Sequence, residues 1–138
     1  WLFWQMAGLG PRAGQANHFR HYAPAFLKDQ RQVAYGATRY TNEVERLYGV
    51  LDTQLKGKDY ICGDYSLADM ASYPWILPAT QGQHIADFPN LMAWHDRMSA
   101  RPAVHKAKEI RSAPAVLAAS GAEAEKARSM LFGQRARR

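Results

Sequence analysis

The sequence predicts an all-helical fold, and three observations carry this prediction. Apolar residues recur at spacings of three and four from about residue 26 to residue 55, which is the period of a helix with one buried face. A Ser-x-x-Asp sequence at residues 66–69 has the form of a helix N-terminus. No stretch alternates apolar and polar residues in the way of a half-buried strand. The 138 residues are enough for one domain with its own core.

A long amphipathic helix is expected at about 26–55, with its entry marked by Ala23-Pro24. Its buried stripe consists of Val33, Ala37, Tyr40, Val44, Leu47, Tyr48, Leu51 and Leu55. Its opposite face carries Arg31, Glu43, Glu45, Asp52 and Gln54. Gly36 lies inside the helix at a cost of up to about 1 kcal/mol relative to alanine. Either packing overrides that local preference, or a close neighbour needs the space.

The segment before this helix is interrupted by residues that disfavour helices, namely Gly8, Gly10, Pro11 and Gly14. We expect them to break an opening helix. Trp4, Trp75 and Trp94 are expected to anchor the core.

A second helix is expected to begin after a turn at residues 56–59. Ser66 is placed as its N-cap, and Asp69 can return a carboxylate to the cap's own N–H, with Asp in the position usually held by Glu or Gln. The alternative, a catalytic Ser66–Asp69 pair, is disfavoured because Ser66 has no histidine to orient it. Residues 71–78 are apolar nearly all round, which predicts a helix buried in the centre of a bundle, kinked at Pro74.

Two further helices follow, one from Pro89 and one from Pro102 to about Ile110, since proline is favoured in the first turn of a helix. The expected organisation is a bundle of about five helices at residues 1–112 and a tail at 113–138. One more helix is possible at residues 122–132, and the last residues are expected to fray.

The net charge of +6 lies entirely in residues 101–138, the last helix and the tail. Residues 1–100 carry nine Lys and Arg against nine Asp and Glu, whereas residues 101–138 carry nine against three. A basic extension on a neutral body is typical of a solvated tail, so no nucleic-acid partner is expected. Phosphate binding through Arg135, Arg137 and Arg138 remains the alternative. No apolar run approaches the roughly 20 residues that cross a bilayer, so no membrane partner is expected either.

The single cysteine, Cys62, excludes an internal disulfide framework and favours a reducing, cytoplasmic location. Its apolar neighbours predict a packed thiol rather than a reactive one. His18 and His21 have the i, i+3 spacing of two metal ligands on a helix, but no third ligand accompanies them, so no metal is expected.

The order of the helices and several short motifs resemble the C-terminal domain of glutathione transferases. The Ser66-Leu67-Ala68-Asp69 helix start and the ending from Pro89-Asn90-Leu91 to Arg101-Pro102-Ala103-Val104 carry this resemblance. The N-terminal motifs resemble the bacterial nu class, whose members are disulfide-bond-reductase-like: Trp1-Leu2-Phe3-Trp4-Gln5, Gly8-Leu9-Gly10-Pro11, Gly14-Gln15, Asn17-His18-Phe19, Ala23-Pro24 and Arg39-Tyr40…Glu43…Arg46-Leu47-Tyr48. The match covers roughly residues 1–110.

The resemblance implies that two domains supply different parts of the active site. In the family, a thioredoxin-like domain holds glutathione, and a helical domain of this type forms the wall of the second-substrate pocket. The thioredoxin-like domain is absent from these 138 residues. The resemblance also implies glutathione as co-substrate, a small disulfide or electrophile as second substrate, and a homodimer. The Trp1–Trp4 cluster would then line the two-fold interface or rest on the missing domain.

Two residues are expected to face glutathione, Arg39 from the resemblance and Tyr35 from its place one turn earlier on the same helix face, and neither is expected to be catalytic. Arg39 matches the family's arginine that reaches bound glutathione, and a guanidinium keeps its charge at any relevant pH. The alternative is a solvated arginine with Glu43 as a surface partner at i+4. Tyr35, one turn earlier, would supply a hydroxyl or a ring to the same pocket, or simply pack in the core or an interface.

Two functions follow as hypotheses. The first is the helical part of a glutathione transferase with glutathione-dependent disulfide reductase or thiol transfer activity. The second is a non-catalytic helical binding or scaffold module, or a truncated fragment.

Overall fold

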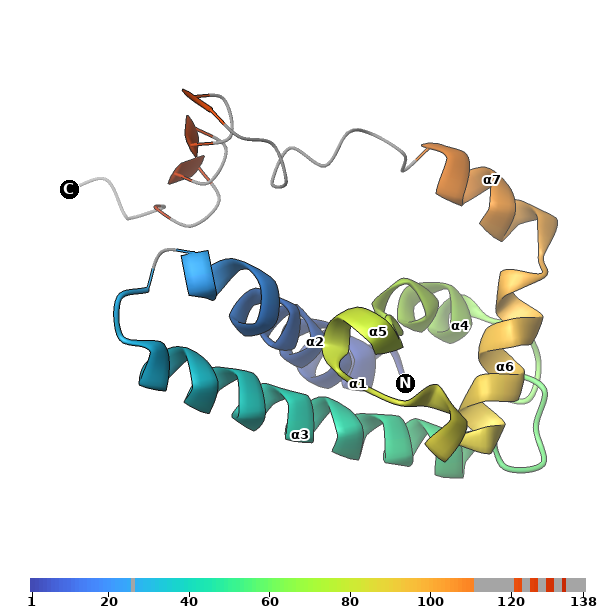
Figure 1. The fold of residues 1–138 in the computed structure, drawn as a ribbon. Coiled ribbons are helices and arrows are strands. Elements are labelled where there is room, and N and C mark those ends of the chain that lie inside the picture. The colour runs from blue at the N-terminus through green and yellow to red at the C-terminus, as the bar shows by residue number, and fades with distance from the viewer. Residues whose placement is uncertain (26, 111–120, 123–124, 127–128, 131–132, 134–138) are drawn as a thin grey trace. The chain divides into compact units, whose positions relative to one another are not determined.

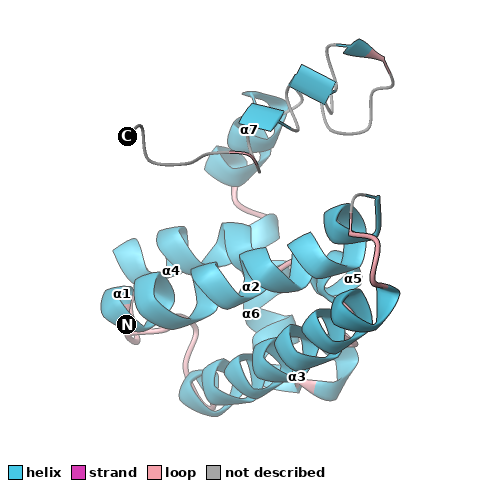
Figure 2. Ribbon diagram, turned by 90° about the vertical axis from the view of Figure 1, so that its left-hand side faces the viewer, coloured by secondary structure: helices cyan, strands magenta, loops and turns pink. Residues whose placement is uncertain are grey.

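Helices make up the regular structure of the computed structural model, which describes residues 1–25, 27–110, 121–122, 125–126, 129–130 and 133 (Figure 1). The chain divides into two compact units, Trp1–Arg101 and Pro102–Arg138. Within the described residues there is no strand, only the isolated bridges Tyr60↔Gly63 and Cys62↔Asp64 in one tight turn (Figure 2). The predicted all-helical class is confirmed.

The opening segment of the first unit is helical almost throughout, so the prediction that glycines and Pro11 break it is wrong. It consists of α1 (Leu2–Trp4), a π-helical turn Gln5–Leu9, α2 (Gly10–Asn17), a second π-helical turn His18–Tyr22 and a 3-10 turn Ala23–Ala25. Pro11 stands near the start of α2 and has no N–H for the Ala7 carbonyl oxygen four residues earlier. That oxygen instead accepts a hydrogen bond from Arg12 Nη1 at 2.8 Å. Burial of Leu9, Ala13 and Ala16 stabilises the helix despite the glycines.

The long helix α3 spans Gln30–Leu55, somewhat later than the predicted start near residue 26, which itself is outside the described residues. Asp29 caps it, because its carboxylate accepts a hydrogen bond from the Arg31 N–H at 3.0 Å. Gly36 is explained by the second of the two alternatives: a Cβ at this position would overlap the ring of Phe19. The glycine therefore admits an aromatic side chain from the preceding segment.

The helix α4 (Leu67–Ser72) begins at the predicted capping box, which is confirmed. It ends before Pro74, and a 3-10 turn Tyr73–Trp75 follows. The expected long, kinked and fully buried helix over residues 71–78 is therefore wrong, because Pro74 terminates the helix instead of bending it. As a consequence Trp75 is 39% exposed rather than a core anchor.

Two short elements precede α6 (Pro89–Ser99): α5 (Pro78–Gln81) and the 3-10 turn Ile85–Asp87. The start of α6 is fixed by α3, because Asp52 accepts hydrogen bonds from the backbone N–H groups of Asn90 (2.8 Å) and Leu91 (2.9 Å). In the second unit, α7 spans Pro102–Ile110 as predicted. The possible helix at 122–132 falls largely outside the described residues.

The core of the first unit lies between α2, α3 and α6, with α2 and α3 running side by side (Figures 1 and 2). Trp94 is fully buried, as predicted, whereas Trp4 is only half-buried. The other large, fully buried side chains are Leu9, Val44, Leu47, Tyr48, Leu51, Leu55, Ile61, Ile76, Gln81, Leu91 and Met98.

Asp69 is the polar centre of this core. It is fully buried and accepts hydrogen bonds from the Ile61 N–H (3.0 Å), the Ser66 N–H (3.0 Å), the Ser66 hydroxyl (3.1 Å) and the Trp94 indole N–H (2.8 Å). One carboxylate thus ties the loop before α4, the start of α4 and the middle of α6 together. Such a group is stable in the interior because its lone pairs are satisfied.

Cys62 departs from its prediction. Its side chain is exposed rather than packed, because the turn that holds it doubles back at Gly63, whose φ of +93° is left-handed.

Candidate functional site

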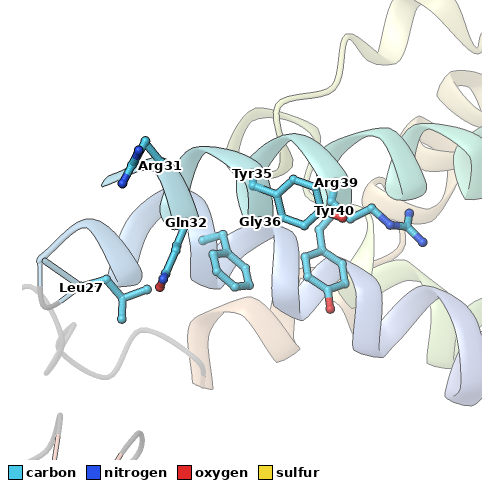
Figure 3. Close-up of a pocket in the computed structure, with 8 residues that line it drawn as sticks. Leu27, Arg31, Gln32, Tyr35, Gly36, Arg39 and Tyr40 are labelled. Atoms are coloured by element: carbon cyan, nitrogen blue, oxygen red, sulfur yellow. The ribbon is translucent and has the colours of Figure 1, made fainter. Parts of the chain in front are cut away.

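A groove of about 670 Å³ runs along the N-terminal half of α3 (Figure 3). We call it the α3 groove, and it is lined by Phe19, Leu27, Arg31, Gln32, Tyr35, Gly36, Arg39 and Tyr40. Tyr35 and Arg39, the two residues expected to face glutathione, are among its lining residues. Seven of the eight come from α3 or the residues just before it, and Phe19 comes from the preceding helical segment.

The floor of the α3 groove is aromatic. The rings of Phe19 and Tyr40 stack with their centroids 5.7 Å apart and their planes at 16°. Phe19 takes this position because Gly36 has no side chain to exclude it. An apolar floor of this kind favours the methylene or sulfur part of a ligand.

Arg39 is exposed and, among the residues that the structure describes, makes no hydrogen bond or ion pair. Glu43, its alternative surface partner, binds Arg46 instead, with Nη2 and Oε1 2.9 Å apart. The hydrogen bond from Arg46 lowers the pKa of the Glu43 carboxyl below its ordinary value, and the charges of Arg46, Arg39 and Arg12 act in the same direction. The guanidinium of Arg39 is thus available to an anion.

Tyr35 is 73% exposed and lies between Arg31 and Arg39 in the row of lining residues (Figure 3). The prediction of Tyr35 and Arg39 on one face agrees with this geometry. The alternative of Tyr35 packed in the core does not, because most of its surface is exposed in this chain.

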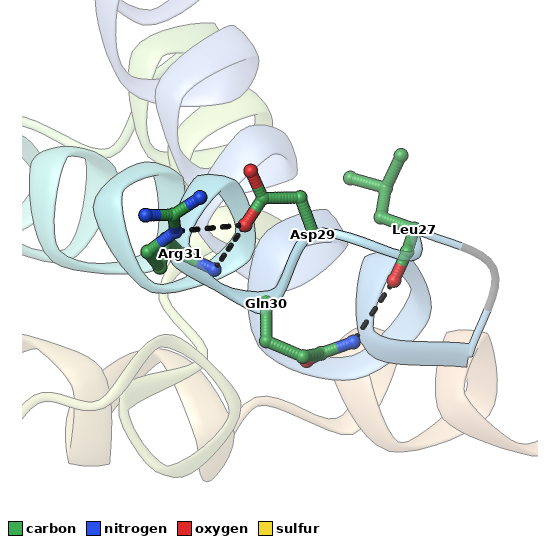
Figure 4. A network of polar contacts seen from close by, with 4 residues as sticks. All are labelled: Leu27, Asp29, Gln30 and Arg31. Atoms are coloured by element: carbon green, nitrogen blue, oxygen red, sulfur yellow. Dashed lines mark hydrogen bonds and ion pairs between the residues drawn. The ribbon is translucent and has the colours of Figure 1, made fainter.

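Arg31 adds a second cation at the other end of the groove. Its Nε lies 3.4 Å from Oδ1 of Asp29, the same oxygen that accepts the hydrogen bond from the Arg31 N–H (Figure 4). Gln30 completes this small network by donating to the Leu27 carbonyl oxygen at 2.9 Å. The Arg31 side chain is 94% exposed, so its ion pair with Asp29 contributes little and exchanges readily for another anion.

His18 and His21, which have the spacing of two metal ligands, make other contacts. His21 Nε2 lies 2.8 Å from the Thr80 carbonyl oxygen. The ring of His18 contacts those of Phe19 and Tyr22, and partial burial lowers the pKa of His18. Among the described residues no three His, Cys, Asp or Glu side chains are grouped as metal ligands. In the same part of the chain, no helix is both long and apolar enough to span a bilayer.

Ser66 and Asp69 are not part of the α3 groove. Asp69 is buried and uses its oxygens on four donors, two of them from Ser66 itself. The pair is structural, as the capping interpretation predicts.

Sequence reasoning assigned only Tyr35 and Arg39 to the site and missed the other six lining residues: Phe19, Leu27, Arg31, Gln32, Gly36 and Tyr40. The spacing of Arg31, Tyr35 and Arg39 at i, i+4 and i+8 was the available signal, because residues four apart share a helix face. No pattern could have supplied Phe19, since its position depends on the packing of a different segment against Gly36.

The helical fold, the capping box and the groove on its long helix define a known class of domain. The chain belongs to the glutathione S-transferase family, and the model of that family's C-terminal domain matches residues 19–102. The resemblance that the sequence motifs indicated is confirmed.

Three similar proteins show which members of this family the chain resembles. The disulfide-bond oxidoreductase YfcG of Escherichia coli is 40% identical over 109 residues, which cover 78% of this chain and 48% of that protein. A glutathione transferase family member from Pseudomonas fluorescens, solved with two glutathione bound, is 37% identical with a TM-score of 0.65 and covers 77% of this chain and 48% of its own. A glutathione transferase from Pseudomonas putida, solved with one glutathione disulfide bound per subunit, is 34% identical with a TM-score of 0.66. The match covers 80% of this chain and 49% of that chain.

The chain therefore spans about half the length of the relatives it matches. Its match is to the helical half, which agrees with the absence of strands from the described residues.

Proposed function

We propose that this chain is the helical part of a glutathione transferase with glutathione-dependent disulfide reductase or thiol transfer activity, and that the α3 groove forms the second-substrate wall of its active site. The single observation that carries the proposal is that Arg39 and Tyr35 line one groove, with the Arg39 guanidinium open to an anion and an aromatic floor beside it. The names of YfcG and of the two Pseudomonas structures support glutathione and a disulfide as the ligands.

In the proposed reaction, glutathione thiolate attacks one sulfur of a disulfide, forms a new S–S bond and releases the other half as a thiolate. A second glutathione thiolate then attacks the mixed disulfide, which gives glutathione disulfide and the second reduced product. Arg39 holds an anionic group of the second glutathione unit, and Tyr35 flanks it. The groups that stabilise the attacking thiolate belong to a thioredoxin-like domain, so no catalytic residue is assigned to this chain.

The same proposal includes the partners that the resemblance implies. The helical domain acts together with a thioredoxin-like domain, in a homodimer, in the cytoplasm. No metal, nucleic acid or membrane takes part. The half-buried Trp1 and Trp4, whose rings meet edge to face at 5.0 Å, lie beside the exposed Leu2 and Phe3 and offer an apolar surface for one of these contacts.

Titration of the chain with oxidised glutathione, followed by ¹H–¹⁵N NMR, tests this proposal. The shifts are expected at the lining residues of the α3 groove, and Arg39→Gln is expected to weaken binding about tenfold, because a hydrogen bond to a charged group contributes about 1.5 kcal/mol or more. Arg12→Gln is the matched control, since Arg12 is exposed, lies outside the groove and, among the described residues, bonds only to the Ala7 carbonyl oxygen.

Binding that survives Arg39→Gln would contradict the role of Arg39. Shifts spread elsewhere, with none in the groove, would instead favour the alternative of a non-catalytic helical module. The coding sequence upstream of Trp1 separates the two hypotheses independently, because the enzyme requires a thioredoxin-like segment there.

A further inference from the structure

We propose that the α3 groove selects its ligand by two negative charges, and that Arg31 is a second anion anchor acting together with Arg39. The ligand class is an organic dicarboxylate with one carboxylate at each end and methylene groups or sulfur between them. The inference rests on the proposed function and deepens it, because it assigns a substrate feature to a residue that neither the sequence motifs nor the family match singles out.

The first step is the spacing of the two cations. Arg31 and Arg39 are eight residues apart on one continuous helix, which places their backbones about 12 Å apart along its axis. They stand at opposite ends of the row of lining residues, with Tyr35 between them (Figure 3). A ligand with one charge reaches one of them, whereas a ligand with two separated charges reaches both.

The second step is the surface between the two cations. Tyr35, Gly36 and the stacked rings of Phe19 and Tyr40 lie there, so the centre of the groove is uncharged and mostly aromatic. The matching ligand has methylene groups or sulfur in its middle. Glutathione meets the charge requirement, because it carries a carboxylate at each end of a tripeptide that spans about 10 Å when extended. Its methylene groups and its sulfur lie between these carboxylates, together with two peptide bonds, and its one ammonium group lies at the γ-glutamyl end.

The third step is the availability of Arg31. Its only ion pair in the described chain is with Asp29, at 3.4 Å and largely exposed. Such a pair contributes at most about 1 kcal/mol, so a ligand carboxylate can replace Asp29 at the Arg31 guanidinium with little loss of free energy. Asp29 is held in place independently, by accepting the Arg31 N–H as the cap of α3, and it does not have to move when the side chain of Arg31 turns to a ligand.

The experiment compares two ligands against four variants of the chain, with binding followed by NMR. S-methylglutathione carries both carboxylates and cannot exchange disulfides, and its glycine ethyl ester lacks one of them. The variants are Arg31→Gln, Arg39→Gln, the double substitution and the control Arg12→Gln. For the dicarboxylate, Arg31→Gln and Arg39→Gln are each expected to raise the Kd roughly three- to tenfold, while Arg12→Gln changes it less than twofold. For the ester, only one of the two arginine substitutions is expected to matter.

A fifth variant is expected to strengthen ligand binding, where the arginine substitutions weaken it. Asp29→Asn keeps a good N-cap but removes the carboxylate that competes for Arg31, so the dicarboxylate is expected to bind up to about threefold more tightly. The midpoint of thermal unfolding checks that every variant remains folded.

The possible failures are distinguishable. If Arg39→Gln weakens binding and Arg31→Gln behaves like Arg12→Gln, the two-charge inference is wrong and the proposed function stands. If both arginine substitutions weaken the dicarboxylate and the ester by the same factors, the groove attracts anions only through its overall charge, and the inference is again wrong. If the chain binds neither ligand, or neither arginine affects binding, the proposed function falls together with the inference.

Discussion

The first unit contains two polar regions that differ in how many of their hydrogen-bonding groups already have partners, and this difference distinguishes groups that stabilise the fold from groups that are open to a ligand. Around Asp69, a buried carboxylate has four donors from three parts of the chain. In the α3 groove, Arg39 has no hydrogen bond or ion pair among the described residues, and Arg31 has one weak pair. A fully satisfied buried group contributes to the fold, whereas an exposed and unsatisfied cation keeps its bonding capacity for a ligand. Substitutions in the first region should therefore unfold the protein, and those in the second should leave it folded and impair binding.

The largest effect is expected from Asp69→Ala. Removing the carboxylate leaves the Ile61 N–H and the Trp94 indole N–H buried without an acceptor, so the free energy of unfolding should fall by about 3–5 kcal/mol. This exceeds the cost of about 1 kcal/mol for a lost cap alone. Urea denaturation measures it, with Asp64→Ala as control, because Asp64 is exposed on the neighbouring turn. A loss of only about 1 kcal/mol would show that the carboxylate acts merely as a helix cap.

The next effect is expected from Gly36→Ala, because Gly36 lines the α3 groove but is buried, so its substitution affects stability as well. Its Cβ would overlap the Phe19 ring, and overpacking of this kind costs about 1–3 kcal/mol. Gly49→Ala is a matched control on the same helix, because its Cβ would lie 3.9 Å from Phe88 in ordinary contact. Gly49→Ala should be neutral or stabilising by up to about 1 kcal/mol. Equal effects of the two substitutions, measured as thermal midpoints, would contradict the assigned packing of Phe19.

A smaller effect, with a defined pH dependence, is expected from Tyr48→Phe. The Tyr48 hydroxyl donates to Gln81 Oε1 at 2.6 Å, and the loss of this bond should cost about 1 kcal/mol. Burial raises the pKa of Tyr48 above its ordinary value of 10.0. Because the unfolded chain loses this proton at lower pH than the folded one, the contribution of Tyr48 is complete below about pH 10 and declines as the pH rises further.

The measurement is the free energy of unfolding of both proteins between pH 8 and pH 11. The difference between parent and Tyr48→Phe should shrink above pH 10. A difference that stays constant over this range would show that Tyr48 ionises equally easily in both states.

The smallest effect on stability is expected from Arg39→Gln, which tests the second of the two regions, the α3 groove. The side chain is exposed and unpaired within the described residues, so the free energy of unfolding should change by less than about 0.5 kcal/mol. Binding of oxidised glutathione should nevertheless weaken about tenfold. A destabilisation comparable to that of Gly36→Ala, seen by urea denaturation, would mean that Arg39 serves the fold and would remove the contrast between the two regions.

The sequence by itself determined the features that depend on neighbours along the chain. The stripe of α3 and the Ser66–Asp69 capping box are set by residues three or four positions apart, and Pro89 and Pro102 mark the first turns of α6 and α7. Local geometry alone fixes such signals, and so they were predicted at nearly the correct positions. A family motif, which is also short and local, indicated Arg39, and the four-residue spacing placed Tyr35 on the same helix face.

Only the tertiary structure decided the features that depend on segments far apart in sequence. The ring of Phe19 occupies the space at Gly36, Trp94 donates to Asp69, and Asp52 caps α6 from α3. Burial against α3 also kept the opening segment helical through its glycines, and Pro74 ended α4 where a kink was expected. The reason is that propensity differences of about 1 kcal/mol per residue are smaller than the free energy of burying a large apolar side chain, so packing overrides them wherever two segments meet.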